Sequence, residues 1–423
     1  MDIRIFASEI IYNIGIVLLE TAIRIHSMWS LKTQKMLSGR RATFEVLQNV
    51  FSGKNHKTIW FHCSSLGEFE QGRPLLELIK IQKPDYKILL TFYSSSGYEM
   101  RKNYPYADCV TYLPADYSTD ALKIIKIVNP EMVFIVKYEF WYQLIKKLHE
   151  NNIPVVLFSS FFYPHHIFFK PYGYLFRKML AYYSMIFVQD SLSQSLLQSI
   201  NIQSYIANDT RFDTVLNLPA NRKLMPDIAH FKGDGILWII GSTHPEDVDV
   251  ICNMLTPQLL KKYNLKILWA PHEIENKDLI YIEQRLKANS ARYTNLKYDA
   301  DILIMNNIGY LASSYYYADF VYIGGGFKGG LHSILEPAVY SKPVLFGPNI
   351  SKYREAQLMV DAHGAFIIEN SASLSQKIIL LCEDISTRTS MGHHAYQMII
   401  NNSGGSKSIY DTVFASQYHS HII

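Results

Sequence analysis

The sequence predicts an α/β protein with two parallel-sheet domains behind an apolar N-terminal helix. The chain has 423 residues, 48% of them hydrophobic, which is too long for one ordinary core. Short apolar runs alternate with helical patterns from residue 57 to 208 and again after residue 228, and this alternation is typical of βαβ units. A polar stretch bracketed by Pro219 and Pro226 interrupts it. We therefore expect two doubly wound, Rossmann-like domains that face a central cleft.

The apolar runs give the expected strands. They lie at residues 58–62, 87–92, 132–136, 154–158 and 185–188, and then at residues 235–240, 265–270, 302–305, 320–323 and 343–346. A helix at residues 118–128 opens with Ser-Thr-Asp capping chemistry and ends at an Asn-Pro pair. The expected domains are residues 41–216 and 229–423, joined by a linker at residues 217–228, after an N-terminal helix and basic linker at residues 1–40. We expect the C-terminal helix to pack back on the first domain.

The N-terminal segment, residues 3–25, has the pattern of a helix with one thin polar stripe. At roughly 100° per residue, the side chains that share this stripe are Asp2, Glu9, Asn13, Glu20 and Arg24. Its charge-free run, residues 10–19, is shorter than the about 20 residues that cross a bilayer. Such a helix can lie in a membrane surface, and an anionic leaflet would suit the basic residues Lys32, Lys35, Arg40 and Arg41. A buried core helix is the alternative.

A second apolar feature is the aromatic stretch at residues 161–172, which prolines interrupt. Aromatic side chains with basic neighbours suit a membrane interface or a lipid acceptor. A packed interlobe loop is the alternative.

Composition and motifs exclude several classes of function. The net charge is +4 and the lysines and arginines are dispersed, so we expect no nucleic-acid partner. The four cysteines lie far apart without CxxC spacing, which indicates neither a zinc site nor a disulfide framework. The fifteen histidines include no HExxH pair, and the chain has no GxSxG elbow and no P-loop lysine. A P-loop is therefore excluded, and the sequence gives no support for a zinc hydrolase or for a GxSxG serine hydrolase.

Acidic side chains follow two of the strands expected in the first domain. Glu68 comes after residues 58–62, at the start of a helix, and Glu139 comes after residues 132–136. Because open parallel sheets bind ligands at the carboxyl ends of their strands, both acids are expected at one edge. Glu68 is either a general base or a carboxylate that complements the helix dipole. Arg211, further along, suits phosphate or a surface ion pair.

A glycine-rich turn at residues 324–330 joins a strand to a helix in the second domain. Glycines let backbone amides approach an anion, and a helix start favours negative charge. Glu336, expected one turn into that helix, is placed to accept hydrogen bonds from ribose hydroxyls, so this segment predicts a nucleotide site. Two DxD strings are interpreted as structural, and no metal site is expected at Asp247, Asp249, Asp299 or Asp301.

These strings, in this order, resemble the Kdo (3-deoxy-D-manno-octulosonic acid) transferase family of GT-B-fold glycosyltransferases. The resemblance runs from about Ile59 to Arg354 and rests on Ser65-Leu66-Gly67-Glu68, Glu139-Phe140-Trp141, Arg211-Phe212-Asp213, Gly241-Ser242-Thr243-His244-Pro245, Leu335-Glu336-Pro337 and Lys342-Pro343-Val344-Leu345-Phe346-Gly347-Pro348. It implies that Glu68 is the catalytic base and that Glu139 and Arg211 stabilise the transition state. It also implies that CMP contacts Pro271, His272, Ile308, Gly309, Tyr310, Ser333, Ile334, Leu335 and Glu336.

The sequence departs from the family pattern at several of these positions. The family commonly has lysine at Arg211, arginine at His272, glutamate at Tyr310 and Asn-Pro at Ser333-Ile334. Arg211 keeps the positive charge that the family has at its position. The residues expected to contact the nucleotide, by contrast, differ from those that the family commonly has. Lys137 stands where the family usually has a further acid.

The resemblance implies a metal-independent, inverting transfer of Kdo from CMP-Kdo to a lipid A precursor in lipopolysaccharide biosynthesis, without a cofactor. Positive charge and helix dipoles can stabilise the leaving phosphate in place of a metal. Family members begin with a hydrophobic anchor, which implies the cytoplasmic face of the inner membrane of a Gram-negative bacterium. Two rival functions remain: a nucleotide-sugar epimerase of the same architecture and a non-catalytic peripheral lipid-binding protein.

Overall fold

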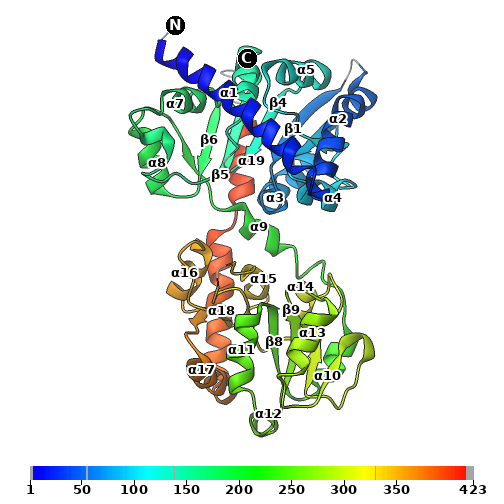
Figure 1. Ribbon diagram of the computed structural model, residues 1–423. Coiled ribbons are helices and arrows are strands. Elements are labelled where there is room, and N and C mark those ends of the chain that lie inside the picture. The colour runs from blue at the N-terminus through cyan, green and yellow to red at the C-terminus, as the bar shows by residue number, and fades with distance from the viewer. Residues whose placement is uncertain (1–2, 54–55, 138, 329, 416–423) are drawn as a thin grey trace. The chain divides into compact units, whose positions relative to one another are not determined.

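A computed structural model describes residues 3–53, 56–137, 139–328 and 330–415 (Figure 1). The chain forms two compact units. Unit 1 comprises Met1–Thr214 with Ser403–Ile423, and unit 2 comprises Val215–Asn402. Each unit is built on a seven-stranded sheet whose paired strands are parallel. The predicted class of two parallel α/β sheets with a long apolar N-terminal helix is confirmed.

The sheet of unit 1 has the strand order β3-β2-β1-β4-β5-β6-β7. Its strands are β1 (Lys57–Cys63), β2 (Tyr86–Phe92), β3 (Cys109–Tyr112), β4 (Met132–Val136), β5 (Val155–Ser160), β6 (Met185–Val188) and β7 (Tyr205–Ile206). The strands predicted for this region are all present. The sequence pattern misses β3 and β7, the two edge strands, because such short runs show no periodicity.

Strand side chains of unit 1 alternate between two hydrophobic cores. Trp60 and Val133 belong to one core, whereas Phe61 and Phe134 belong to the other and stack with ring centroids 4.8 Å apart. Helices therefore cover both faces of the sheet. They are α1 (Ile3–His26), α2 (Leu31–Phe51), α3 (Leu66–Gln82), α4 (Ser95–Arg101), α5 (Ser118–Val128), α6 (Tyr142–Glu150), η1 (Ile167–Phe169), α7 (Tyr174–Leu180), α8 (Ser191–Gln198), α9 (Thr210–Leu216) and, against α3, α19 (Gly405–Phe414).

The sheet of unit 2 has the strand order β10-β11-β9-β8-β12-β13-β14. Its strands are β8 (Ile236–Thr243), β9 (Leu265–Pro271), β10 (Ser290–Arg292), β11 (Ile302–Ile304), β12 (Phe320–Ile323), β13 (Val344–Phe346) and β14 (Ala365–Ile367). The pattern again misses the edge strands, β10 and β14. The helices are α10 (Pro226–Lys232), α11 (Pro245–Met254), α12 (Pro257–Tyr263), α13 (Asn276–Glu283), η2 (Tyr293–Asn295), α14 (Leu311–Ser314), η3 (Tyr315–Tyr317), α15 (Leu335–Ala338), α16 (Arg354–Asp361), α17 (Ser371–Glu383) and α18 (Ile385–Asn402).

Both sheets reverse their winding beside their first strand. In unit 1, β1 lies between β2 and β4, and in unit 2, β8 lies between β9 and β12. Such a switch point opens a crevice at the carboxyl ends of the strands, where open α/β sheets bind ligands. The segments that follow β1 and β4, and those that follow β8, β9 and β12, are thus placed to form sites.

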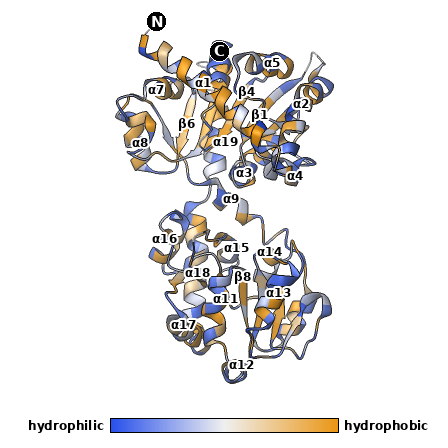
Figure 2. Cartoon of the chain, in the orientation of Figure 1, coloured by the Kyte–Doolittle hydropathy of each residue, from blue (hydrophilic) through white to orange (hydrophobic). Residues whose placement is uncertain are grey.

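Helix α1 attaches to unit 1 through its polar stripe. Glu9 pairs with Lys146 at 2.6 Å and Glu20 pairs with Arg40 at 2.9 Å. Of the described residues of α1, Ile16 and Glu20 are the buried ones, so the alternative of a buried core helix is wrong. The helix is long and apolar enough to cross a membrane by length and composition. Figure 2 colours much of α1 orange, as hydrophobic, and apolar side chains of the helix are exposed at Ile3, Phe6, Ile11, Ile14, Val17 and Leu18.

The aromatic stretch at residues 161–172 packs within unit 1. Phe162 and Phe168 are buried, with ring centroids 5.5 Å apart. Arg177 donates a hydrogen bond to the Phe168 carbonyl at 2.9 Å. Tyr172 remains exposed. The stretch is therefore a packed loop with an aromatic edge in solvent.

Candidate functional site

Glu68 lies at the start of α3, directly after β1. Its backbone N–H donates to Ser65 Oγ at 3.4 Å, and its Oε2 accepts a hydrogen bond from the Ser65 backbone N–H at 3.0 Å. This reciprocal pair is a capping box. The capping box holds the carboxylate at the carboxyl end of β1, as the sequence predicts.

Glu139 follows β4, the neighbour of β1, and its side chain is buried in a polar network. Trp141 Nε1 donates a hydrogen bond to Glu139 Oε2 at 2.6 Å. His62 Nε2 lies 3.5 Å from the same oxygen, an ion-pair distance, and His62 Nδ1 lies 2.9 Å from Thr91 Oγ1. Sequence reasoning misses His62, whose only signal is a polar side chain at the end of an apolar strand.

The two carboxylates have opposite pKa shifts. Burial, joined by the negative charge of Glu139, raises the pKa of Glu68. Burial also acts to raise the pKa of Glu139, but the hydrogen bond and charge of His62, with hydrogen bonds from Ser64 and Trp141, outweigh burial and lower that pKa. Two neighbouring acids whose environments separate their pKa values have different roles in proton transfer. Glu68 is the group suited to exchange a proton, and Glu139 is the group that stays ionised.

Arg211 is the second residue of α9, and its side chain is held by Asp209, which precedes the helix. Its Nε and Nη2 donate to Asp209 Oδ2 at 2.9 and 2.7 Å, and its backbone N–H donates to Asp209 Oδ1 at 2.9 Å. Thr210 Oγ1 donates to the Gln71 carbonyl of α3, which attaches α9 to the helix that begins near Glu68. The Arg211 side chain is 32% exposed, so its guanidinium is accessible to a ligand despite the ion pair.

A basic pocket of about 300 Å³ lies beside α1, α2 and α5. Arg40 Nε and Nη2 have no hydrogen-bond partner among the described residues, and the guanidinium lies 4.2 Å from the Tyr93 ring centroid. Tyr93 stacks on Trp141, which binds Glu139. A chain of contacts through Tyr93 and Trp141 therefore links Arg40, in the pocket wall, to Glu139. Its lining includes Glu20, Arg24, Leu37, Arg40, Arg41, Phe44, Tyr117 and Asp120.

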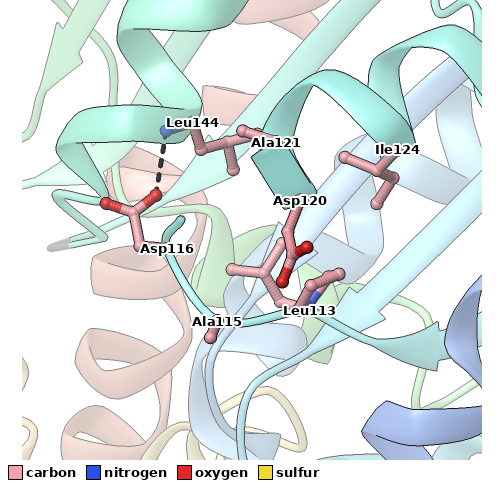
Figure 3. A pocket seen from close by; sticks show the side chains of 8 residues that line it. Leu113, Ala115, Asp116, Asp120, Ala121, Ile124 and Leu144 are labelled. Carbon is pink, nitrogen blue, oxygen red and sulfur yellow. Dashed lines mark hydrogen bonds between the residues drawn. The ribbon is translucent and has the colours of Figure 1, made fainter. Parts of the chain in front are cut away.

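A smaller pocket lies between the end of β3 and helices α5 and α6 (Figure 3). Within it, Asp116 accepts hydrogen bonds at 2.9 Å from the backbone N–H groups of Gln143 and Leu144, at the start of α6. Tyr12 of α1 donates to the same carboxylate at 2.6 Å. Burial raises the pKa of Asp116. Asp116 thus caps α6 and attaches α1 to unit 1, which is a structural role.

In unit 2, Asp247 holds the glycine turn after β12. It accepts hydrogen bonds from Tyr322 Oη at 2.7 Å and from the Gly325 and His244 backbone N–H groups at 2.9 Å each. Gly325 has φ +92°, and a Cβ there would meet the Gly330 carbonyl oxygen at 2.3 Å, so glycine is required. Asp247 therefore has the structural role predicted for it.

The residues expected around CMP lie on three segments of unit 2. The first segment is the end of β9, with Pro271 and His272, and the second precedes α14, with Ile308, Gly309 and Tyr310. The third runs into α15 and carries Ser333, Ile334, Leu335 and Glu336. Glu336 is the second residue of α15, not one turn into a longer helix as predicted, because the helix begins only at Leu335. Sequence reasoning misses Lys223, whose Nζ donates to the Gly309 carbonyl at 3.3 Å and lies 4.6 Å from the Tyr310 ring centroid.

Three histidines meet at the switch point of unit 2. The ring centroids of His244, His272 and His332 are 4.5 to 5.3 Å apart. Burial and the charges of the other two lower the pKa of His332 to about 4. The sequence gives no local motif for this cluster because its members follow three different strands.

Comparisons with known proteins agree with the predicted resemblance. The family described as 3-Deoxy-D-manno-octulosonic-acid transferase (kdotransferase) matches residues 39–214. The chain is 25% identical over 369 residues to the 3-deoxy-D-manno-octulosonic acid transferase of Haemophilus influenzae, covering 84% of this chain and 86% of that protein. It is also 25% identical over 346 residues to the enzyme of the same name from Aquifex aeolicus, covering 79% and 90%.

Among solved structures, the UDP-GlcNAc 2-epimerase from Neisseria meningitidis matches with a TM-score of 0.61 and 14% identity, covering 84% of this chain and 99% of that chain. That from Methanocaldococcus jannaschii matches with a TM-score of 0.53 and 14% identity, covering 82% and 99%. At this identity the likeness shows the fold alone.

The two parallel seven-stranded sheets give the chain a GT-B-like fold, with an acid pair at the switch point of the first sheet. The family match covers the unit that carries this acid pair. Over most of its length the chain is similar to 3-deoxy-D-manno-octulosonic acid transferases, and its first unit matches the model of that family.

Proposed function

We propose that this chain transfers Kdo from CMP-Kdo to a lipid A precursor by an inverting displacement, with Glu68 as the general base. The observation that carries the proposal is the acid pair of unit 1, in which the pKa of Glu68 is raised beside an ionised Glu139. The relatives that match most of the chain bear the name of this transferase, which supports the reaction class.

In the proposed reaction the acceptor hydroxyl attacks the anomeric carbon of Kdo. The bond from that carbon to the CMP phosphate oxygen breaks, and Glu68 takes the hydroxyl proton. A general base works best when its pKa approaches the operating pH, which the raised pKa of Glu68 favours. Glu139, kept ionised by Trp141 and His62, stabilises positive charge that develops on the sugar ring. The exposed face of Arg211 offers a cation to an anionic substrate group.

Unit 2 holds the donor nucleotide in this proposal. The glycine turn allows backbone amides to approach a phosphate, and Asp247 fixes the turn in position. Glu336 accepts hydrogen bonds from ribose hydroxyls, and Lys223 adds positive charge beside the turn at Gly309. No step of the proton transfer at Glu68 requires a metal.

The acceptor side of the proposal uses α1 and the basic pocket. The apolar face of α1 is exposed while its polar stripe is bonded to unit 1, which suits a helix at a membrane surface. Arg24, Arg40 and Arg41 line the neighbouring pocket and suit an anionic lipid head group. We place the protein at the cytoplasmic face of the inner membrane.

Mass spectrometry of a lipid A precursor incubated with the purified protein and CMP-Kdo tests the proposal. The expected result is a lipid that gains the mass of Kdo, with release of CMP. Unchanged lipid together with epimerisation of UDP-GlcNAc would favour the epimerase alternative. Lipid binding without any calorimetric heat from CMP would favour the non-catalytic alternative.

A further inference from the structure

Three imidazole side chains converge at the switch point of the unit 2 sheet. His244 follows β8, His272 follows β9 and His332 lies in the turn after β12, and these three strands are adjacent in the order β9-β8-β12. One ring nitrogen from each histidine lies within 4.8 Å of the others. His244 Nε2 and His332 Nε2 are 3.1 Å apart.

These separations are close to those of a metal site. Zinc binds histidine nitrogen at roughly 2.0–2.1 Å in tetrahedral geometry, which puts two ligand nitrogens about 3.3 Å apart. The His244 and His332 nitrogens are already near that spacing. The ring of His272 must move inward by a side-chain rotation, and its side chain is 41% exposed and therefore able to rotate.

The backbone around the three histidines is fixed by hydrogen bonds. The His272 N–H donates to the Thr243 carbonyl at 3.1 Å, and the His332 N–H donates to the Gly324 carbonyl at 3.3 Å. The His244 N–H donates to the buried carboxylate of Asp247 at 2.9 Å. A metal site held on rigid strand ends loses little entropy on binding. A cavity of about 50 Å³ beside His244 and His272 leaves room for a further ligand.

We propose that His244, His272 and His332 form a binding site for one divalent transition-metal ion of the zinc type. Three neutral imidazoles are a ligand set that suits zinc and its neighbours in the first transition row, whereas Mg²⁺ prefers oxygen. Three protein ligands leave a fourth position for water or a phosphate oxygen. The inference goes beyond the proposed transfer reaction, because it assigns an ion to unit 2 and leaves proton transfer at Glu68 unchanged. The expectation of no metal site would then be wrong, since ligands from separate strands show no sequence spacing.

Metal titration of the full chain tests the proposal. The protein is treated with a chelator, desalted and titrated with Zn²⁺ by calorimetry, and with Co²⁺ by visible absorption. The expected result is one Zn²⁺ per chain and a d–d spectrum of low-coordinate Co²⁺, with neither displaced by excess Mg²⁺. His272→Ala and His332→Ala should each weaken Zn²⁺ binding by about 100-fold or more, because even residues that only support metal ligands contribute about 10–100-fold.

His393→Ala is the matched control, because His393 is exposed and lies beside another histidine, His394, with ring centroids 6.3 Å apart. It should leave Zn²⁺ binding unchanged. Absence of stoichiometric Zn²⁺ binding, or equal binding by the wild type and both site variants, would overturn the proposal in favour of a hydrogen-bonded histidine cluster. A CMP titration of the same samples separates the two proposals. Binding of Zn²⁺ without binding of CMP supports the metal site and counts against the transferase function. Binding of CMP without binding of Zn²⁺ counts against the metal site.

Discussion

Replacing Glu68 by glutamine separates the two roles that the structure gives this side chain. The change keeps the volume and keeps an oxygen that can accept the hydrogen bond now made by the Ser65 N–H at 3.0 Å. What it loses is basicity and negative charge at the start of α3. The lost charge–dipole interaction should lower the free energy of unfolding by about 0.3–1 kcal/mol. Removing a carboxylate whose pKa is raised mainly by burial offsets part of that loss.

The expected effect on catalysis is much larger. Loss of a general base lowers turnover by about 10²–10⁴-fold, which corresponds to about 2.7–5.4 kcal/mol in activation free energy. CMP affinity should be unchanged, since the residues proposed to bind CMP belong to unit 2. The assay combines a thermal melt, CMP calorimetry and Kdo transfer measured on the same preparation.

Ser65→Ala is the control for this prediction. It removes the hydroxyl that accepts the Glu68 N–H hydrogen bond but keeps the Ser65 N–H that orients the carboxylate. It should cost about 0.5–2 kcal/mol of stability and leave transfer near the wild-type rate. The reasoning is refuted if Glu68→Gln transfers Kdo near the wild-type rate while Ser65→Ala shows the larger loss.

Three further predictions test the neighbouring parts of the proposal. Glu139→Gln removes negative charge that helps to raise the pKa of Glu68, so the acidic limb of kcat/KM against pH should move to lower pH as the maximum falls; an unmoved limb would contradict the coupling. Glu336→Gln should weaken CMP binding by about 1.5–3 kcal/mol, as for a hydrogen bond to a charged group, and unchanged calorimetric affinity would remove Glu336 from the site. Ile11→Ser combined with Leu18→Ser should lower the fraction of protein that pellets with membranes and leave the melt unchanged, because these side chains are 70% and 64% exposed; equal pelleting would place the membrane contact elsewhere.

The interiors of both sheets were predictable from sequence, whereas their edges were not. Parallel strands buried on both faces give continuous apolar runs, which locate β1, β4 and β8 well. Edge strands such as β7 and β10 are short and form mainly by pairing with a neighbour. Nothing in their own residues separates them from loops.

The placement of Glu68 and Glu139 was predictable because each acid directly follows a strand at the switch point. Their different pKa shifts were not, because these depend on His62, a residue inside a strand that meets Glu139 only through the pairing of β1 with β4. For Arg211 the sequence left two alternatives open, a phosphate contact and a surface ion pair. The structure shows an ion pair with Asp209. The convergence of His272 with two other histidines depends on strand order, which spacing along the chain does not reveal.

The most direct test of the account is the mass of the lipid product made from CMP-Kdo and a lipid A precursor by the wild type and by Glu68→Gln, side by side. The account predicts that the wild type adds Kdo to the lipid, and that the variant, folded and able to bind CMP, forms the same product more slowly by about 10²-fold or more. No Kdo-bearing lipid from the wild type would contradict the proposed transfer. Equal product formation by both proteins would contradict the claim that the carboxylate at the end of β1 removes the acceptor proton.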